Sequence, residues 1–96
     1  MNEFFKSLGR RWTKAAERRG VKIEDPKLDP KVAEELLALA AVVAHTTERR
    51  FAPLASYTAG IAVERLREAK AEDPEAIAAF IREVREELER EGPSSG

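Results

Sequence analysis

One stretch of the sequence predicts the fold, residues Leu36–Val63, which read LLALAAVVAHTTERRFAPLASYTAGIAV. It is the only part of the chain that is apolar on nearly every side, and a helix of that kind has to be enclosed by other elements. Pro53 interrupts the helical pattern, because its ring clashes with the carbonyl four residues earlier. We therefore expect a buried central helix that ends before Pro53 and a tight corner leading into a third helix. A single proline-kinked helix is the alternative.

Helices are also predicted on both sides of this stretch. An apolar stripe in the first 20 residues, with Trp12 as its anchor, predicts a helix that ends at Gly20. Asp29 before Pro30 is a helix start signal, since the aspartate can cap free amides and the proline lacks an amide that would need a partner there. Asp73 before Pro74 repeats this signal. The last helix has an apolar stripe at Ile77, Phe80, Ile81, Val84 and Leu88.

The connector between the first two helices has no helical period and contains Pro26. We expect it to be extended, with Val21, Ile23 and Leu28 against the core. The fold predicted from these elements is an all-α, single-domain bundle of four helices with a buried central helix and a proline corner. Residues 1–91 form the helical domain, and residues 92–96, GPSSG, are expected to be a disordered tail.

Composition narrows the class of protein. The chain of 96 residues has no cysteine, which excludes disulfides, thiolate catalysis and cysteine-ligated zinc. No apolar run approaches the roughly 18 residues that span a bilayer, so a cytoplasmic protein without membrane association is expected. Charged residues are 36% of the chain, and their abundance is typical of thermostable proteins. A chain this short has little room for a deep cleft, which favours an interaction module over an enzyme.

Candidate site residues lie at the proline corner. His45 is the only histidine, and its spacing to Arg49 predicts that both side chains share one face near the end of the central helix. Arg49 and Arg50 offer forked donors and Tyr57 a hydroxyl, so the corner could bind a small anion or a nucleotide phosphate. An equally physical interpretation is structural, because cations near a helix C-terminus interact favourably with its carbonyls.

The sequence gives less support to metal binding, hydrolase chemistry or nucleic-acid binding. One histidine with Glu48 as its only acidic neighbour does not make a metal site, and neither Ser7 nor Ser56 has the sharp-turn context of a hydrolase nucleophile. We predict no catalytic residue, no metal and no cofactor. Weak nucleic-acid binding through the basic first helix is a further alternative, which the net charge of -1 disfavours. The basic residues of that helix are Lys6, Arg10, Arg11, Lys14 and Arg18.

The central motif resembles a known family. Val43-Ala44-His45, then Arg49, then Ala52-Pro53-Leu54, then Gly60 are similar to the pattern of a small bacterial helical domain of unknown function. That domain occurs alone or attached to MobA-like molybdenum-cofactor guanylyltransferases. The resemblance covers about the first two-thirds of the chain and implies an accessory domain in molybdopterin cofactor metabolism, with no assigned reaction.

The sequence therefore predicts a non-catalytic helical interaction or accessory module that binds a protein partner or a second copy of itself. Homodimerisation is expected because a short chain with this many apolar helix positions can cover one face with a copy. Anion or nucleotide-phosphate binding at His45, Arg49, Arg50 and Tyr57 is the first alternative, and nucleic-acid binding is the second.

Overall fold

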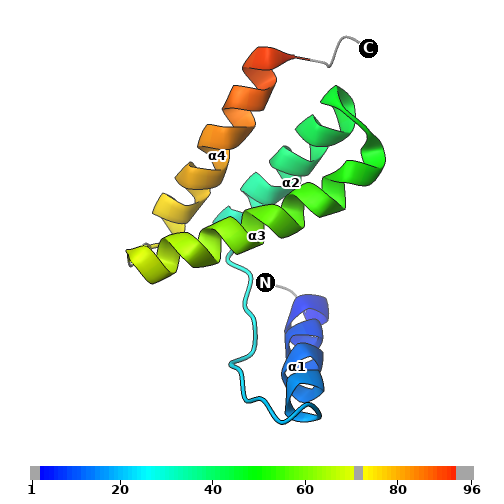
Figure 1. Cartoon of the computed structure of the whole chain (residues 1–96), viewed down its shortest axis with the longest axis vertical. Helices are drawn as coiled ribbons and strands as arrows, with labels where there is room; N and C mark the ends of the chain where they lie inside the picture. The colour runs from blue at the N-terminus through cyan, green and yellow to red at the C-terminus, as the bar shows by residue number, and fades with distance from the viewer. Residues whose placement is uncertain (1–2, 71–72, 93–96) are drawn as a thin grey trace. The chain divides into compact units, whose positions relative to one another are not determined.

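The computed structural model describes residues 3–70 and 73–92. Regular structure in these residues is entirely helical (Figure 1), which confirms the prediction of an all-α chain with four helices. The α-helices are α1 (Glu3–Glu17), α2 (Pro30–Thr46), α3 (Ala52–Ala69) and α4 (Pro74–Glu91), with a 3-10 turn, η1 (Arg49–Phe51), between α2 and α3. The chain divides into two compact units, residues 1–30 and residues 31–96.

The first unit is α1 with the connector that follows it. Gly9 is buried, and a side chain there would meet the backbone oxygen of Pro26 at 2.7 Å, so the glycine allows the connector to approach the helix closely. The Thr13 hydroxyl donates to Asp25 on the same side of α1. Gly20 has a φ of 76° and ends the helix in the left-handed conformation, as predicted. The absence of a side chain at Gly9 therefore has a packing role in this unit.

The prediction of Trp12 as a buried anchor is wrong. Its side chain is 57% exposed in the structure, and Val21 and Ile23 of the connector are exposed as well. Only Leu28 of the three connector residues expected against the core is partly buried. The apolar spacing therefore located the helix correctly, but burial of the stripe did not follow from it.

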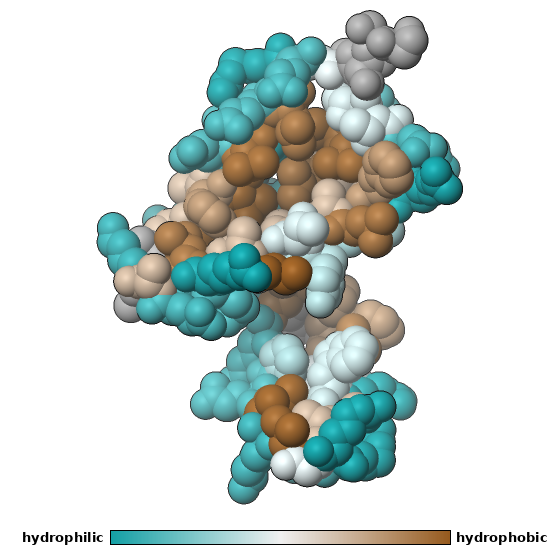
Figure 2. Space-filling model, in the orientation of Figure 1, coloured by the Kyte–Doolittle hydropathy of each residue, from teal (hydrophilic) through white to brown (hydrophobic). Residues whose placement is uncertain are grey.

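The second unit contains a core shared by three helices. Leu39 and Val43 of α2 pack with Val63 of α3 and with Ile77 and Ile81 of α4. Figure 1 shows α2 and α4 running side by side with α3 across them. This core is small. Figure 2 shows that apolar side chains also gather at the surface, in the region of α2 and α4. Partly buried residues complete it, namely Val32, Leu36, Ala55, Ala59, Phe80 and Leu88.

The central helix, α2, is buried on one side only. Ala33, Leu39 and Val43 are buried, whereas Leu37 is 73% exposed and Ala41 is exposed. Leu37 lies about half a turn away from Leu39 around the helix, so the two side chains point in opposite directions. The expectation of burial on all sides is corrected to a single packed face.

The corner after α2 forms as predicted, but α2 ends earlier than Pro53 requires. The hydroxyls of Thr46 and Thr47 donate to the carbonyls of Val42 and Val43, at 2.8 and 2.7 Å. Glu48 then adopts extended backbone angles, and η1 leads directly into α3. A corner with two distinct helices is therefore confirmed over one kinked helix.

The predicted start of α4 is confirmed in detail. Asp73 caps the helix, its carboxylate accepting a hydrogen bond of 2.8 Å from the amide of Ala76, and Pro74 occupies the first turn. Ile77 and Ile81 are buried, whereas Val84 of the predicted stripe is 45% exposed. Within the described residues, no helix is long and apolar enough to cross a bilayer. Of the predicted disordered tail, residues 93–96 lie outside the described residues.

Two leucines of α2 provide a matched test of the core. We expect Leu39→Ala to lower the free energy of unfolding by about 2–4 kcal/mol, because it removes buried contacts and leaves a cavity. Leu37→Ala removes the same atoms from an exposed position and should change it by less than about 0.5 kcal/mol. Urea unfolding followed by circular dichroism measures both. Equal losses for the two variants would contradict the one-sided burial of α2.

Candidate functional site

The predicted site residues at the corner are all exposed and belong to three elements. His45 is in the last turn of α2, Arg49 and Arg50 form most of η1, and Tyr57 is in the second turn of α3. Arg50 is occupied locally, since it lies 3.5 Å from a Glu48 carboxylate oxygen and 5.6 Å from the centre of the Phe51 ring.

The prediction that His45 and Arg49 share one helix face is wrong. Helix α2 ends at Thr46, and the extended backbone of Glu48 breaks the helical spacing between the two residues. In the described part of the chain, no hydrogen bond or ion pair joins His45, Arg49 and Tyr57 to one another. The structure therefore does not assemble these side chains into a compact anion site, and anion binding stays a prediction.

The possible metal ligands of the described residues are not grouped together. Among residues 3–70 and 73–92, no three histidine, aspartate or glutamate side chains lie close enough together to hold a metal ion. The basic residues of α1 are exposed, and Lys6 lies 3.7 Å from the Glu3 carboxylate. Nucleic-acid binding by this helix stays a prediction.

The best-formed polar cluster joins α2 to α4. Glu35 has a side chain only 14% exposed, and its two carboxylate oxygens accept from Arg82 Nε at 2.9 Å and from Arg85 Nε at 3.3 Å. Arg85 also donates to Glu89, four residues along α4, at 2.8 Å. This cluster joins α2 to α4.

Burial and the two arginines act on Glu35 in opposite directions. Desolvation of the carboxyl group would raise its pKa, but hydrogen bonds and charge from Arg82, and then from Arg85, lower the pKa below its ordinary value. The carboxylate is therefore charged at neutral pH, and its charge favours the folded state.

The outer side of α3 carries three exposed apolar side chains in one row. Leu54 is 61% exposed, Tyr57 is 72% exposed and Ile61 is 37% exposed. Their spacing of three and four residues puts them on one face. Ala55, Ala59 and Val63 pack inward on the other face. Helix α3 is thus apolar on two opposite sides, which is unusual for a helix with one side in solvent.

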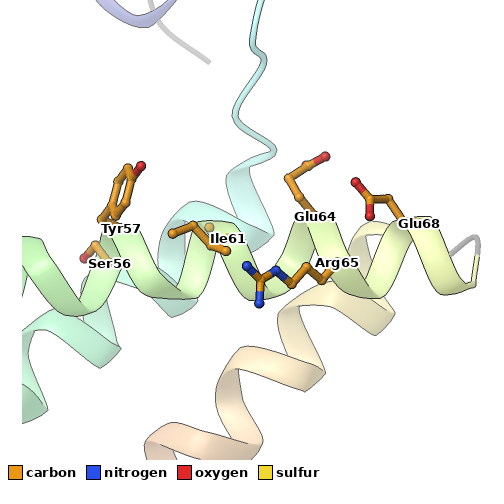
Figure 3. A pocket seen from close by; sticks show the side chains of 7 residues that line it. Ser56, Tyr57, Ile61, Glu64, Arg65 and Glu68 are labelled. Atoms are coloured by element: carbon orange, nitrogen blue, oxygen red, sulfur yellow. The ribbon is translucent and has the colours of Figure 1, made fainter.

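A shallow, open groove follows this outer side, from Ser56 to Glu68. Figure 3 shows Tyr57, Glu64 and Glu68 projecting from the same side of α3, with Ile61 between them, while Arg65, which also lines the groove, extends along the helix toward Ile61. Gly60 also lines the groove, and no atom lies within 4 Å of where its side chain would be. The groove therefore has an open part that is aromatic and apolar, and a charged end where Glu64 and Glu68 lie with Arg65.

Comparison with known proteins identifies the chain at the family level. The sequence profile of the domain of unknown function DUF6457 matches residues 6–95. The chain belongs to the DUF6457 family. This finding agrees with the predicted resemblance to a small family of unknown function. No curated protein and no solved structure matches the DUF6457 chain significantly.

Sequence reasoning missed the outer side of α3 in this DUF6457 domain. It predicted a third helix after the corner at Pro53 but did not separate the larger residues Leu54, Tyr57 and Ile61 from the residues of that helix that face the core. The signal was available, because Ala55, Ala59 and Val63 fall on one side of a helix and the three larger residues on the other. Helical spacing alone could have shown that α3 has two apolar faces.

The Glu35 cluster predicts how stability depends on pH. A depressed folded-state pKa contributes stability above the unfolded-state pKa of Glu35, and the contribution is lost as pH falls through the folded-state value. Glu35→Gln should therefore lower the free energy of unfolding by about 0.5–1.5 kcal/mol at pH 7. The difference from wild type should disappear in acid. Urea unfolding at both pH values measures it, with the exposed Glu86→Gln as control. A difference that persists unchanged in acid would contradict the assignment.

Proposed function

We propose that the protein is a non-catalytic helical interaction module that binds another protein chain through the outer side of α3. The observation that carries this proposal is the exposure of Leu54, Tyr57 and Ile61 as one contiguous row. Apolar anchors at this spacing are the usual means by which one helix recognises another. Tyrosine in particular contributes a large contact area with little loss of conformational freedom.

The shape of the surface supports binding of a chain rather than chemistry on a small molecule. The groove is open along its length and is lined by residues of α3 alone. Catalytic pockets usually enclose most of their ligand and bring polar groups together from several elements. A helix laid along α3 would instead cover the whole row at once.

The biological setting is proposed from the resemblance of the central motif. Domains with a similar motif are attached to MobA-like molybdenum-cofactor guanylyltransferases, which supports an accessory role in molybdopterin cofactor metabolism. A cytoplasmic location is part of this proposal. The partner is either a protein of that process or a second copy of the chain.

Site-specific photo-crosslinking tests the proposal. A photoreactive phenylalanine analogue at Tyr57, introduced into the full chain in cells of the source organism, should form a covalent adduct with a protein on illumination. The same analogue at Glu83, exposed on α4, is the control and should give little adduct. Adduct formation at position 57 with any protein, including a second copy, supports an interaction face. Absence of adducts, or equal yields at both positions, would contradict it.

A further inference from the structure

We propose that α1 binds the surface of an anionic lipid bilayer, with its aromatic side chains in the interface and its basic side chains against the headgroups. This inference concerns the first unit and does not depend on the function proposed for α3. The expectation of no membrane association came from the lack of a spanning run. A helix that lies on the surface needs only one apolar side.

The apolar residues of α1 fall on one side of the helix and are open to solvent at their largest members. At about 100° per residue they span about a third of the circumference. Phe4 is 65% exposed, Trp12 is 57% exposed, and the ring of Phe5 packs edge-on against that of Phe4. Aromatic residues of this kind favour the boundary between water and lipid. The apolar side of α1 consists of Phe4, Phe5, Leu8, Trp12, Ala15 and Ala16.

Basic residues border the apolar side, and the acidic residues of α1 lie away from it. Arg11 and Arg18, seven residues apart, follow one edge of the apolar side, and Lys14 lies just behind them. Glu3 and Glu17 lie on the opposite side of the helix. A flat anionic surface can therefore contact the apolar side and its basic edge together without meeting a carboxylate of the helix.

The whole chain shows the same separation of charge. Residues 1–22 contain seven basic and two acidic residues, whereas residues 23–96 contain ten basic and sixteen acidic residues. Such asymmetry indicates a membrane or nucleic-acid partner for the basic part. Nucleic acid would neutralise the basic side chains and leave most of the apolar side in water. An anionic bilayer surface covers both, because headgroups pair with cations and the acyl boundary takes up the aromatic rings.

The connector lengthens the apolar side and does not cover it. It packs against α1 at Gly9, beside the apolar side, through the backbone of Pro26. At the end of the helix the amide of Val21 donates to the Ala16 carbonyl at 2.9 Å, which places Val21 next to the last apolar turn. Val21 is 53% exposed and Ile23 is 40% exposed. The first unit therefore presents further apolar side chains next to the aromatic ones.

The fluorescence of Trp12, the only tryptophan of the chain, reports on the apolar side directly. Vesicles of equal parts phosphatidylglycerol and phosphatidylcholine, added to the full chain, should shift its emission to shorter wavelength. Quenching by acrylamide should fall several-fold, because the indole ring leaves water. Vesicles of phosphatidylcholine alone should bind about tenfold more weakly, and added salt should weaken binding to the anionic vesicles.

Two phenylalanines provide a matched test of the apolar contact. Phe4→Ala should lower the affinity for anionic vesicles about tenfold, because a large side chain no longer enters the interface. Phe51→Ala makes the same change at an exposed position of η1 and should leave the affinity unaltered. Cosedimentation with vesicles measures both, and circular dichroism verifies that the helices persist. Equal affinities of the two variants would overturn the assignment of the contact to α1.

Two pairs of cations test the orientation of the helix. Arg11→Gln combined with Arg18→Gln should lower the affinity about tenfold, since both side chains border the contact. Lys6→Gln combined with Arg10→Gln removes the same charge from the opposite side of α1 and should lower the affinity about threefold at most. Equal losses for the two pairs would overturn the proposed orientation.

Three results would overturn the proposal as a whole. The first is that anionic vesicles neither shift the emission of Trp12 nor sediment with the chain. The second is that Trp12 is already shielded from acrylamide in the free chain, which would show that the protein itself covers the apolar side. The third is that a mixed-sequence RNA oligonucleotide binds to the chain and vesicles do not, which would assign the basic residues to nucleic acid.

Discussion

The packing of Val63 between α2 and α4 is the contact on which the account depends. It joins Leu39, Val43, Ile77 and Ile81 in the core and so fixes the rotation of α3 about its own axis. Once that side of α3 is turned inward, helical geometry turns the row from Leu54 to Ile61 outward. The exposed row is therefore a consequence of the core and not an independent feature of the surface.

The core that fixes α3 is small, and charged side chains at its edge reinforce it. Glu35 is held by Arg82 and Arg85, so α2 and α4 are joined by ionic hydrogen bonds as well as by apolar contacts. Lys31 and Glu75 form a second ion pair between the same helices. Exposed pairs contribute little individually, but the side chains of Arg85 and Glu35 are only 18% and 14% exposed, so their ion pair is partly shielded from water. Helix α3 has no comparable polar link to its neighbours among the described residues, so its position depends on apolar packing.

Local signals in the sequence predicted where the helices begin better than they predicted which side chains are buried. The Asp-Pro steps at Pro30 and Pro74 gave correct helix starts, because capping depends only on neighbouring residues. At the end of α2, the hydroxyls of Thr46 and Thr47 donate to the carbonyls of Val42 and Val43. The spacing of apolar residues does not predict these bonds. The prediction that Trp12 is buried failed. Burial depends on which helices pack together, and helical periodicity does not specify that. The resemblance of the central motif predicted a small family of unknown function. The DUF6457 profile match over residues 6–95 agrees with that prediction.

Hydroxyl-radical footprinting of Tyr57, the only tyrosine of the chain, tests the central claim most directly. The claim is that the outer side of α3 is open in a single chain and covered in the assembled protein. Tyr57 should oxidise rapidly in the isolated chain at nanomolar concentration and several-fold more slowly when a protein partner or a second copy covers α3, while the exposed Trp12 of the first unit serves as the reference. Protection of Tyr57 that is already complete in the dilute chain would contradict the account, because it would show that α3 is covered from within.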